Sequence, residues 1–275
     1  MPESSTQPQK AIAPGRPQRP TCVLLCSDNE NLAESAKSYA ALFFDVLGYQ
    51  TYARQAKSLG DDIEQCLRSG DVDFLFSFLC PVIIKRDILE AVRQVPINFH
   101  PAPPAYPGVG SASYAIYNGD PCFGVTAHVM EARPDSGMII GTESFPIFGE
   151  DTCESLFGRA TNYALFQFYG VLEEIARTGQ VRRTGQEWER KAITRCEFEQ
   201  WMTLSLDAPL DEIGRKVKAL RHSRSPGPFI EINGETVDLI RMLESKYATS
   251  QLENLPQFLR ELTRNRGAKV KECIH

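Results

Sequence analysis

Asn98 and His100 stand two positions apart at the end of the apolar segment PINFH, and His128 and Asp135 follow further along the chain. On a β-strand, residues i and i+2 point to the same face, so Asn98 and His100 can contact one substrate. Histidine and aspartate are typical of acid–base catalysis near neutral pH. The alternatives are a structural histidine at a strand end and, for Asp135 in PDSG, a turn residue. Four polar residues on neighbouring strand ends or loops favour the catalytic interpretation.

The segment that follows His100, HPAPPAYPGVG, is rich in proline. Pro103, Pro104 and Pro107 lack N–H donors and have a fixed φ, so the segment cannot extend a sheet or form a helix. A rigid loop restricts the backbone before binding, which is useful where a substrate must be held in one orientation. The alternative is a surface loop that only joins a strand to a helix.

The elements that would position these residues alternate along the first half of the chain. Strands are expected at 21–27, 49–54, 73–79 and 96–100, with helices at about 32–47, 61–70 and 85–92 between them. This alternation predicts an α/β fold with a Rossmann-like, mostly parallel sheet flanked by helices. In open sheets of this kind ligands bind beyond the carboxyl ends of the strands, which is where Asn98 and His100 fall.

The second half of the chain predicts further elements and a change of character after about residue 205. A helix is expected at 111–120, strands at 123–130 and 136–147, a long helix at 152–179, a short helix at 209–222 and a hairpin around Asn233-Gly234. The prediction is a disordered leader at 1–20, a catalytic domain at 21–205, and a small C-terminal region of helix and hairpin at 206–275.

The composition restricts the class of protein. The chain has 275 residues, 42% of them hydrophobic and 24% charged, and a net charge of −5, which argues against a protein that coats a nucleic-acid backbone. The eight cysteines show no paired CxxC spacing, so reduced thiols are expected and no metal site is predicted. The first residues contain no apolar signal-peptide core, and no segment is long enough to span a membrane. A soluble cytoplasmic protein is expected.

Four short motifs together resemble a known family. They are Asn-x-His-Pro from Asn98, Pro-x-Tyr-x-Gly from Pro104, Gly-Val-Thr-x-His from Gly124, and Asp-x-Gly-x-Ile-Ile from Asp135. In this order and with these separations they resemble the folate-dependent formyltransferases, over about residues 20 to 200. That family includes methionyl-tRNA formyltransferase, glycinamide ribonucleotide formyltransferase and the sugar N-formyltransferases.

The resemblance implies that Asn98, His100 and Asp135 are catalytic and that 10-formyltetrahydrofolate is the formyl donor, released as tetrahydrofolate. An amine would attack the formyl carbon, and Asn98 with His100 would stabilise the oxyanion that develops. His100 would also accept the proton of the attacking amine, while Asp135 orients the imidazole. The proline-rich loop would then wall the active site.

The resemblance also implies where the folate binds. The expected contacts, which the family makes largely through backbone atoms, involve Leu79, Cys80, Pro81, Val82, Ile83, His128, Ala132 and Arg133. For the apolar segment around Val82, core packing is the alternative interpretation.

The acceptor is the least determined part of the resemblance. Methionyl-tRNA formyltransferase carries a complete C-terminal barrel and a basic surface, whereas this chain is acidic and has about 70 residues after Asp207. Glycinamide ribonucleotide formyltransferase has a glycine-rich phosphate loop after its first strand, where this chain reads CSDNEN. The form HPAPPAYPG and the short C-terminal region resemble the sugar N-formyltransferases.

The predicted acceptor is therefore a nucleotide-linked 4-amino-4,6-dideoxysugar, such as GDP-perosamine or a dTDP-linked amino sugar, used for O-antigen and lipopolysaccharide synthesis. The predicted acceptor contacts are Tyr106, Gly108, Lys216, Arg221 and Arg224, and Tyr114 and Trp188 are further candidates. The three cations would form a basic cluster that binds the diphosphate; a solvated helix face is the alternative.

Three other functions stay open at this point: methionyl-tRNA formyltransferase activity, formyltetrahydrofolate hydrolysis in which water replaces the amine, and folate binding without catalysis. The hydrolase family carries an additional N-terminal regulatory domain, for which this sequence shows no segment of sufficient length. No nucleic-acid or membrane partner is expected, and the resemblance is compatible with a homodimer.

Overall fold

The computed structural model describes residues 19–205, 208–222, 225–232, 235–247 and 257. The leader expected at the N-terminus lies outside the described residues, except for its last two positions. Arg224 and the hairpin turn Asn233-Gly234 also lie outside them.

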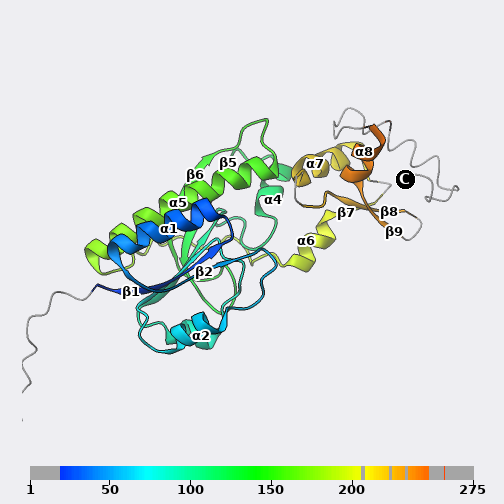
Figure 1. The fold of residues 1–275 in the computed structure, drawn as a ribbon. Coiled ribbons are helices and arrows are strands. Elements are labelled where there is room, and N and C mark those ends of the chain that lie inside the picture. Colours follow the sequence, from blue (N-terminus) through cyan, green and yellow to red (C-terminus); the bar gives the residue numbers. More distant parts are fainter. Residues whose placement is uncertain (1–18, 206–207, 223–224, 233–234, 248–256, 258–275) are drawn as a thin grey trace, which may run out of the picture.

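A six-stranded sheet forms the centre of the fold, in the order β2-β1-β3-β4-β5-β6 (Figure 1). Its strands are β1 (Thr21–Ser27), β2 (Asp45–Tyr52), β3 (Phe74–Phe78), β4 (Val95–His100), β5 (Cys122–Val129) and β6 (Ile139–Pro146). The first four strands pair in parallel, and β5 and β6 continue the sheet antiparallel to their neighbours. The predicted α/β fold with a mostly parallel sheet is confirmed.

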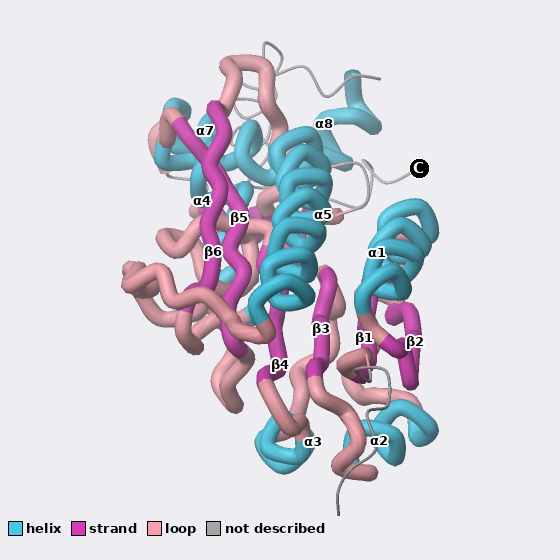
Figure 2. Tube along the Cα trace, turned by 90° about the vertical axis from the view of Figure 1, so that its left-hand side faces the viewer, coloured by secondary structure: helices cyan, strands magenta, loops and turns pink. Residues whose placement is uncertain are grey.

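Helices cover both faces of this sheet. The helices α1 (Glu30–Phe43) and α5 (Cys153–Thr178) lie side by side on one face, and α2 (Asp61–Arg68) and α3 (Arg86–Ala91) lie on the other (Figures 1 and 2). The long helix α5 begins at the N-cap Thr152 and ends at Gly179, as the sequence predicts. The helix α4 (Ser111–Asn118) follows the proline-rich loop and ends at Gly119 with φ 73°.

Alternation along β4 fixes the direction of the candidate catalytic side chains. Ile97 and Phe99 are fully buried, and Phe99 packs against Phe168 of α5 with ring centroids 4.9 Å apart. Since neighbouring residues of a strand point to opposite faces, Asn98 and His100 face away from α5. They lie on the sheet face that carries α2 and α3.

The expected helix at 32–47 is wrong at its C-terminal end. The helix α1 stops at Phe43, Phe44 is already extended, and β2 begins at Asp45 and pairs in parallel with β1. Gly48 therefore lies within a strand and does not end a helix; a Cβ at this position would approach the side chain of Ile63 to 3.0 Å. The apolar residues after Phe43 pair with the sheet, which a helical pattern does not reveal.

The C-terminal part of the chain forms a second, smaller unit. Its elements are α6 (Arg195–Met202), β7 (Thr203–Leu204), α7 (Leu210–Leu220), β8 (Phe229–Ile232), β9 (Glu235–Asp238) and α8 (Leu239–Tyr247). The strands form a sheet in the order β7-β8-β9, and α7 lies against α4 of the larger unit (Figure 1). The predicted helix and hairpin are present; α6 and β7 are additional. Among the described residues, no helix has the length and apolarity needed to cross a membrane.

Candidate active site

Asp135 lies between two imidazoles. Its Oδ1 is 3.2 Å from Nε2 of His128 and its Oδ2 is 3.5 Å from Nδ1 of His100. The carboxylate side chain is 11% exposed and those of the two histidines 9% or less, so the three groups interact with little solvent screening. The structure brings together residues that are far apart in the sequence.

Asn98 joins this group through the pairing of β4 with β5. Asn98 stands opposite His128 in the antiparallel register, and its Nδ2 is 3.1 Å from Nε2 of His128. The second ring nitrogen of His128, Nδ1, is 2.9 Å from the carbonyl oxygen of Val129. With both ring nitrogens engaged inside the protein, His128 connects Asn98 to Asp135.

The proline-rich loop, residues 101–110, contributes backbone groups to the same cluster. The N–H of Gly108 donates to Oδ2 of Asp135 over 2.8 Å, and Nε2 of His100 lies 3.1 Å from the carbonyl oxygen of Tyr106. Gly108 has φ 87°, a conformation that favours glycine. The loop therefore holds both the imidazole and the carboxylate, which explains the need for a rigid segment after His100.

The surroundings of Asp135 keep it ionised. Burial alone would raise its pKa, but the charges of His100 and His128, together with hydrogen bonds from His128 and the Gly108 N–H, outweigh burial and hold the pKa well below its usual range. Asp135 also has a positive φ of 44°, which aspartate tolerates better than most residues. Asp135 is therefore a turn residue of the PDSG segment and a candidate catalytic residue at the same time.

Residues 184–193, called the strap below, cross the same face of the sheet. At one end the hydroxyl of Thr184 donates to the carbonyl oxygen of Ile139 over 2.9 Å. At the other end the N–H of Ile193 donates to the carbonyl oxygen of Pro107 over 3.0 Å. The strap therefore links the edge strand β6 to the proline-rich loop and passes beside Asp135.

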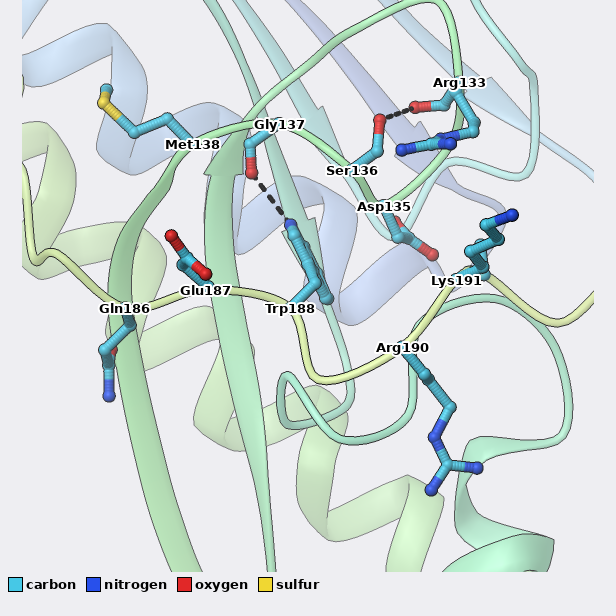
Figure 3. Close-up of a pocket in the computed structure, with 11 residues that line it drawn as sticks. Arg133, Asp135, Ser136, Gly137, Met138, Gln186, Glu187, Trp188, Arg190 and Lys191 are labelled. Atoms are coloured by element: carbon cyan, nitrogen blue, oxygen red, sulfur yellow. Dashed lines mark hydrogen bonds between the residues drawn. The ribbon is translucent and has the colours of Figure 1, made fainter.

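A pocket of about 510 Å³ opens between the strap and the loop that carries Asp135. Figure 3 shows Asp135 and Lys191 on one side of it, Arg190 pointing away from Asp135, and Trp188 directed toward Gly137. Arg133, Arg190 and Lys191 give the rim three cations, and Glu187 adds one negative charge. A pocket of this size, with one buried carboxylate and a basic rim, fits a polar ligand with negative charge.

The residues predicted to bind folate belong to three segments of the chain. Five of them, Leu79, Cys80, Pro81, Val82 and Ile83, follow β3; Ala132 and Arg133 precede Asp135; and His128 belongs to β5. Val82 is buried, as core packing would require, whereas Ile83 is 66% exposed. The folate contacts stay predictions, and the geometry gives His128 the separate task of holding Asp135 and Asn98.

The predicted acceptor contacts are only partly brought together. Gly108 and Tyr106 lie beside the candidate catalytic residues, but Tyr106 is buried and its hydroxyl donates to Asp120 and accepts from Asn118. Burial and the bond to Asp120 raise the pKa of Tyr106 to about 12, so the hydroxyl stays protonated and supports the loop from within.

The expected basic surface cluster is corrected at Lys216. Its side chain is buried, donates to the carbonyl oxygen of Trp201, and lies 4.9 Å from the centre of the Trp201 ring. Burial lowers the pKa of Lys216. Arg221 is on the surface at the end of α7, so these two residues do not form one exposed patch.

The strap is the part of the site that motif reasoning missed, apart from naming Trp188. Its sequence, TGQEWERKAI, has no helical or strand periodicity, and the hydrogen bonds that anchor it reach Ile139, Pro104 and Pro107, which are distant in the sequence. The single signal was a tryptophan among charged residues, which indicates a side chain with a packing partner elsewhere.

The comparison with curated proteins gives relatives that are longer than the matched region. A methionyl-tRNA formyltransferase from Latilactobacillus sakei subsp. sakei (strain 23K) is 26% identical over 169 residues, 60% of this chain and 51% of that protein. The chain thus matches about half the length of this relative.

Solved structures with the same fold include sugar N-formyltransferases. The enzyme from Shewanella sp. FDAARGOS_354 has a TM-score of 0.63 at 19% identity. The matched region covers 80% of this chain and 96% of the Shewanella chain. A 4-N formyltransferase from Francisella tularensis has a TM-score of 0.63 at 18% identity, covering 79% and 95%. The N-formyltransferase of Helicobacter canadensis, in complex with folinic acid and dTDP-3-aminofucose, has a TM-score of 0.58 at 16% identity, covering 79% and 86%.

The family model described as formyl transferase matches residues 7–166, which is more than half of the chain. The matched region contains Asn98, His100, His128 and Asp135; both histidines contact the Asp135 carboxylate, and Asn98 contacts His128. The chain belongs to the formyl transferase family.

Proposed function

We propose that this protein is a sugar N-formyltransferase. It moves the formyl group of 10-formyltetrahydrofolate to the amine of a nucleotide-linked 4-amino-4,6-dideoxysugar. The observation that carries the proposal is the convergence of Asn98, His100 and Asp135, in which one buried carboxylate contacts the His100 imidazole directly and is joined to the Asn98 amide through His128. Family membership supplies the formyl donor that this chemistry requires.

In the proposed reaction the amine nitrogen attacks the formyl carbon and negative charge develops on the formyl oxygen. The amide N–H of Asn98 stabilises this charge, and His100, with its Nδ1 held by Asp135, takes the proton of the attacking amine through Nε2. The bond between the formyl carbon and N10 of the folate then breaks, and N10 receives a proton. Asp135 stabilises the charged imidazole throughout, because its low pKa keeps it ionised.

The folate is assigned to the loop after β3 and to the loop before Asp135. The residues from Leu79 to Ile83 leave the carboxyl end of a central parallel strand, the usual position of ligands in open α/β sheets. Ala132 and Arg133 are exposed in the loop that precedes Asp135. Backbone groups of these two loops can bind the edge of a planar pterin, as the family resemblance implies.

Two observations support an amino-sugar acceptor. The sugar N-formyltransferases resemble this fold over nearly their whole length. One neighbour of this chain is described as a 4-N formyltransferase, and another is in complex with dTDP-3-aminofucose. The product would be a formylated nucleotide sugar for a surface polysaccharide such as O-antigen.

A second candidate is formylation of methionyl-tRNA, which the curated relatives perform. The net charge of −5 disfavours it, because tRNA binding depends on cationic surface. The candidate is retained because the sequence matches are to this class.

The deciding experiment is an acceptor screen. The purified chain is incubated with 10-formyltetrahydrofolate and, separately, with GDP-perosamine, dTDP-4-amino-4,6-dideoxyglucose, dTDP-3-aminofucose and initiator methionyl-tRNA. We expect tetrahydrofolate and formylated product with an amino-sugar nucleotide, and no product with the His100→Ala variant. Formylation of the tRNA alone would establish the second candidate and overturn the first.

A further inference from the structure

Trp188 occupies the middle of the strap and lies against both imidazoles of the site. Its Nε1 donates to the carbonyl oxygen of Gly137 over 2.8 Å (Figure 3). Its ring is 5.0 Å from the His128 ring at 84° and 6.0 Å from the His100 ring at 67°, measured between ring centres. Edge-to-face contacts of this kind stabilise the orientation of both rings.

The strap is anchored on both sides of Trp188, so the indole has a fixed position. Before it, the hydroxyl of Thr142 on β6 donates to the side-chain oxygen of Gln186 over 2.9 Å. Immediately after it, the N–H of Glu189 donates to the carbonyl oxygen of Pro104 over 3.2 Å. The Trp188 indole, fixed between these two hydrogen bonds, therefore forms one wall of the site, against His100 and His128.

The position of this wall explains why the candidate catalytic groups are so little exposed. The sheet face that carries α2 and α3 extends over β4 and β5, where neither helix covers His100 and His128. The strap crosses this part of the face, and Trp188 is the aromatic residue it places on the two rings. His100 is 8% and His128 2% exposed beneath it.

We propose that Trp188 is a positioning residue that makes the formyl group react with an amine and not with water. The inference rests on the proposed function. The indole holds the two imidazoles in place and excludes water from the side of His100 and Asp135 that it covers. The pocket beside Trp188 provides the space for the acceptor along the strap.

The competing reaction is chemically simple. In transfer, a C–N bond forms to the acceptor amine while the bond from the formyl carbon to N10 breaks. In hydrolysis, a C–O bond forms to water, the same bond to N10 breaks, N10 is protonated, and formate leaves. His100 and Asp135 assist both reactions equally, so the selection depends on which nucleophile reaches the formyl carbon.

The test compares formate release with transfer in Trp188 variants of the full chain. Trp188→Ala removes the wall, Trp188→Leu leaves a smaller apolar side chain, and Trp188→Phe keeps an aromatic ring without the N–H. Trp201 is the other tryptophan of the chain and lies outside the site against Tyr114 and Tyr117, so Trp201→Phe is the matched control. Circular dichroism melting verifies that each variant is folded.

With 10-formyltetrahydrofolate and the acceptor that the screen identifies, we expect Trp188→Ala to raise the ratio of formate to formylated product about 10-fold. Trp188→Phe and Trp201→Phe should stay within about twofold of the original protein. If Trp188→Ala does not fold, Trp188→Leu decides, with a smaller rise expected.

A purely structural role would lower transfer and hydrolysis in parallel and leave the ratio unchanged in Trp188→Ala and Trp188→Leu, which would overturn the inference. Failure of the proposed function has a different signature. In that case the original protein would yield no formylated product from any acceptor, irrespective of the rate at which the Trp188 variants release formate.

Discussion

The N–H of Gly108 donates a 2.8 Å hydrogen bond to Oδ2 of Asp135, so a backbone group of the proline-rich loop binds the buried carboxylate of the site. Gly108 also pairs with Ile193 of the strap in a parallel bridge. One glycine therefore connects the loop, the strap and Asp135. Any change that moves its backbone must move the carboxylate as well.

Replacing Gly108 by alanine should damage both stability and catalysis. A Cβ at this position would lie 2.2 Å from the carbonyl oxygen of Ile193, and the residue has φ 87°. We expect a loss of about 3 kcal/mol or more in the free energy of unfolding, together with loss of formyl transfer. Gly119→Ala is the control, because Gly119 has φ 73° but open space around it, and should cost about 1–2 kcal/mol. Equal losses in urea unfolding would contradict the contact with Ile193.

Asn98→Ala and His100→Ala should each reduce kcat about 100-fold while the protein remains folded. Each change removes a group proposed to act mainly in the transition state, so KM for the folate should change much less. Asn162→Ala on the exposed surface of α5 is the matched control for loss of an amide. Steady-state rates near those of the original protein in either variant would remove that residue from the catalytic assignment.

Asp135→Asn should retain substrate binding and lose rate, because it keeps the shape but removes the charge that stabilises the His100 imidazolium. The low pKa of Asp135 means that the carboxylate stays ionised across the acidic range in the original protein. The acidic limb of its kcat profile should therefore not report titration of Asp135. A full rate for Asp135→Asn, measured from pH 5 to 8, would exclude an electrostatic role; Asp62→Asn, on exposed α2, is the control.

Lys216→Met should leave KM for the acceptor unchanged, because the buried ammonium binds the Trp201 carbonyl and is not on the surface. The expected effect is on thermal stability, through the lost hydrogen bond. Lys218→Met is the control for a lysine of the same helix that donates to a backbone carbonyl, that of Gly149, from an exposed position. A several-fold increase in acceptor KM specific to Lys216→Met would restore the phosphate-binding interpretation.

Arg159→Ala should destabilise the protein by about 3 kcal/mol, because it leaves the buried carboxylate of Asp151 without its cation. The two guanidinium nitrogens lie 2.7 and 3.0 Å from the carboxylate oxygens. Arg177→Ala, at the exposed end of the same helix, is the control. Equal unfolding free energies for Arg159→Ala and the control would contradict the role of the pair.

The same pair gives a pH dependence with a definite sign. Burial would raise the pKa of Asp151, but bonds from Arg159, Ser155 and the Phe148 N–H outweigh it and lower the pKa. The stabilisation is therefore fully present above the pKa of the unfolded chain, about 3.9, and is lost as the pH falls through the lower folded value. The difference between Arg159→Ala and the original protein should shrink on acidification, as unfolding curves at several pH values can establish.

Short-range sequence patterns predicted the parts of the fold and of the site that depend on residues close together in the chain. Alternation along β4 placed Asn98 and His100 on one face, and the turn residues of PDSG placed Asp135 at a loop. Lys216 could also have been predicted to be buried, because it lies three residues after Ile213 and four before Leu220, on the apolar stripe of α7. A positive charge does not by itself place a helical residue at the surface, because the long aliphatic part of a lysine can pack on an apolar stripe.

Other features depend on contacts that a single segment does not encode. The end of α1 is set by pairing between β2 and β1, and the course of the strap is set by acceptors on β6 and on the proline-rich loop. Trp188 meets His100 and His128 only after the sheet has formed. Such features need the tertiary structure, since the segments involved have no periodicity of their own.

The strap begins after Gly179, beyond the last residue that the family model matches, and yet it forms one wall of the pocket. A genetic exchange of the segment after Gly179 would replace Trp188, Arg190 and Lys191 together. It would leave in place the four polar residues Asn98, His100, His128 and Asp135. Because Trp188 also lies against His100 and His128, such an exchange would change the lining of the pocket and the support of the two imidazoles together.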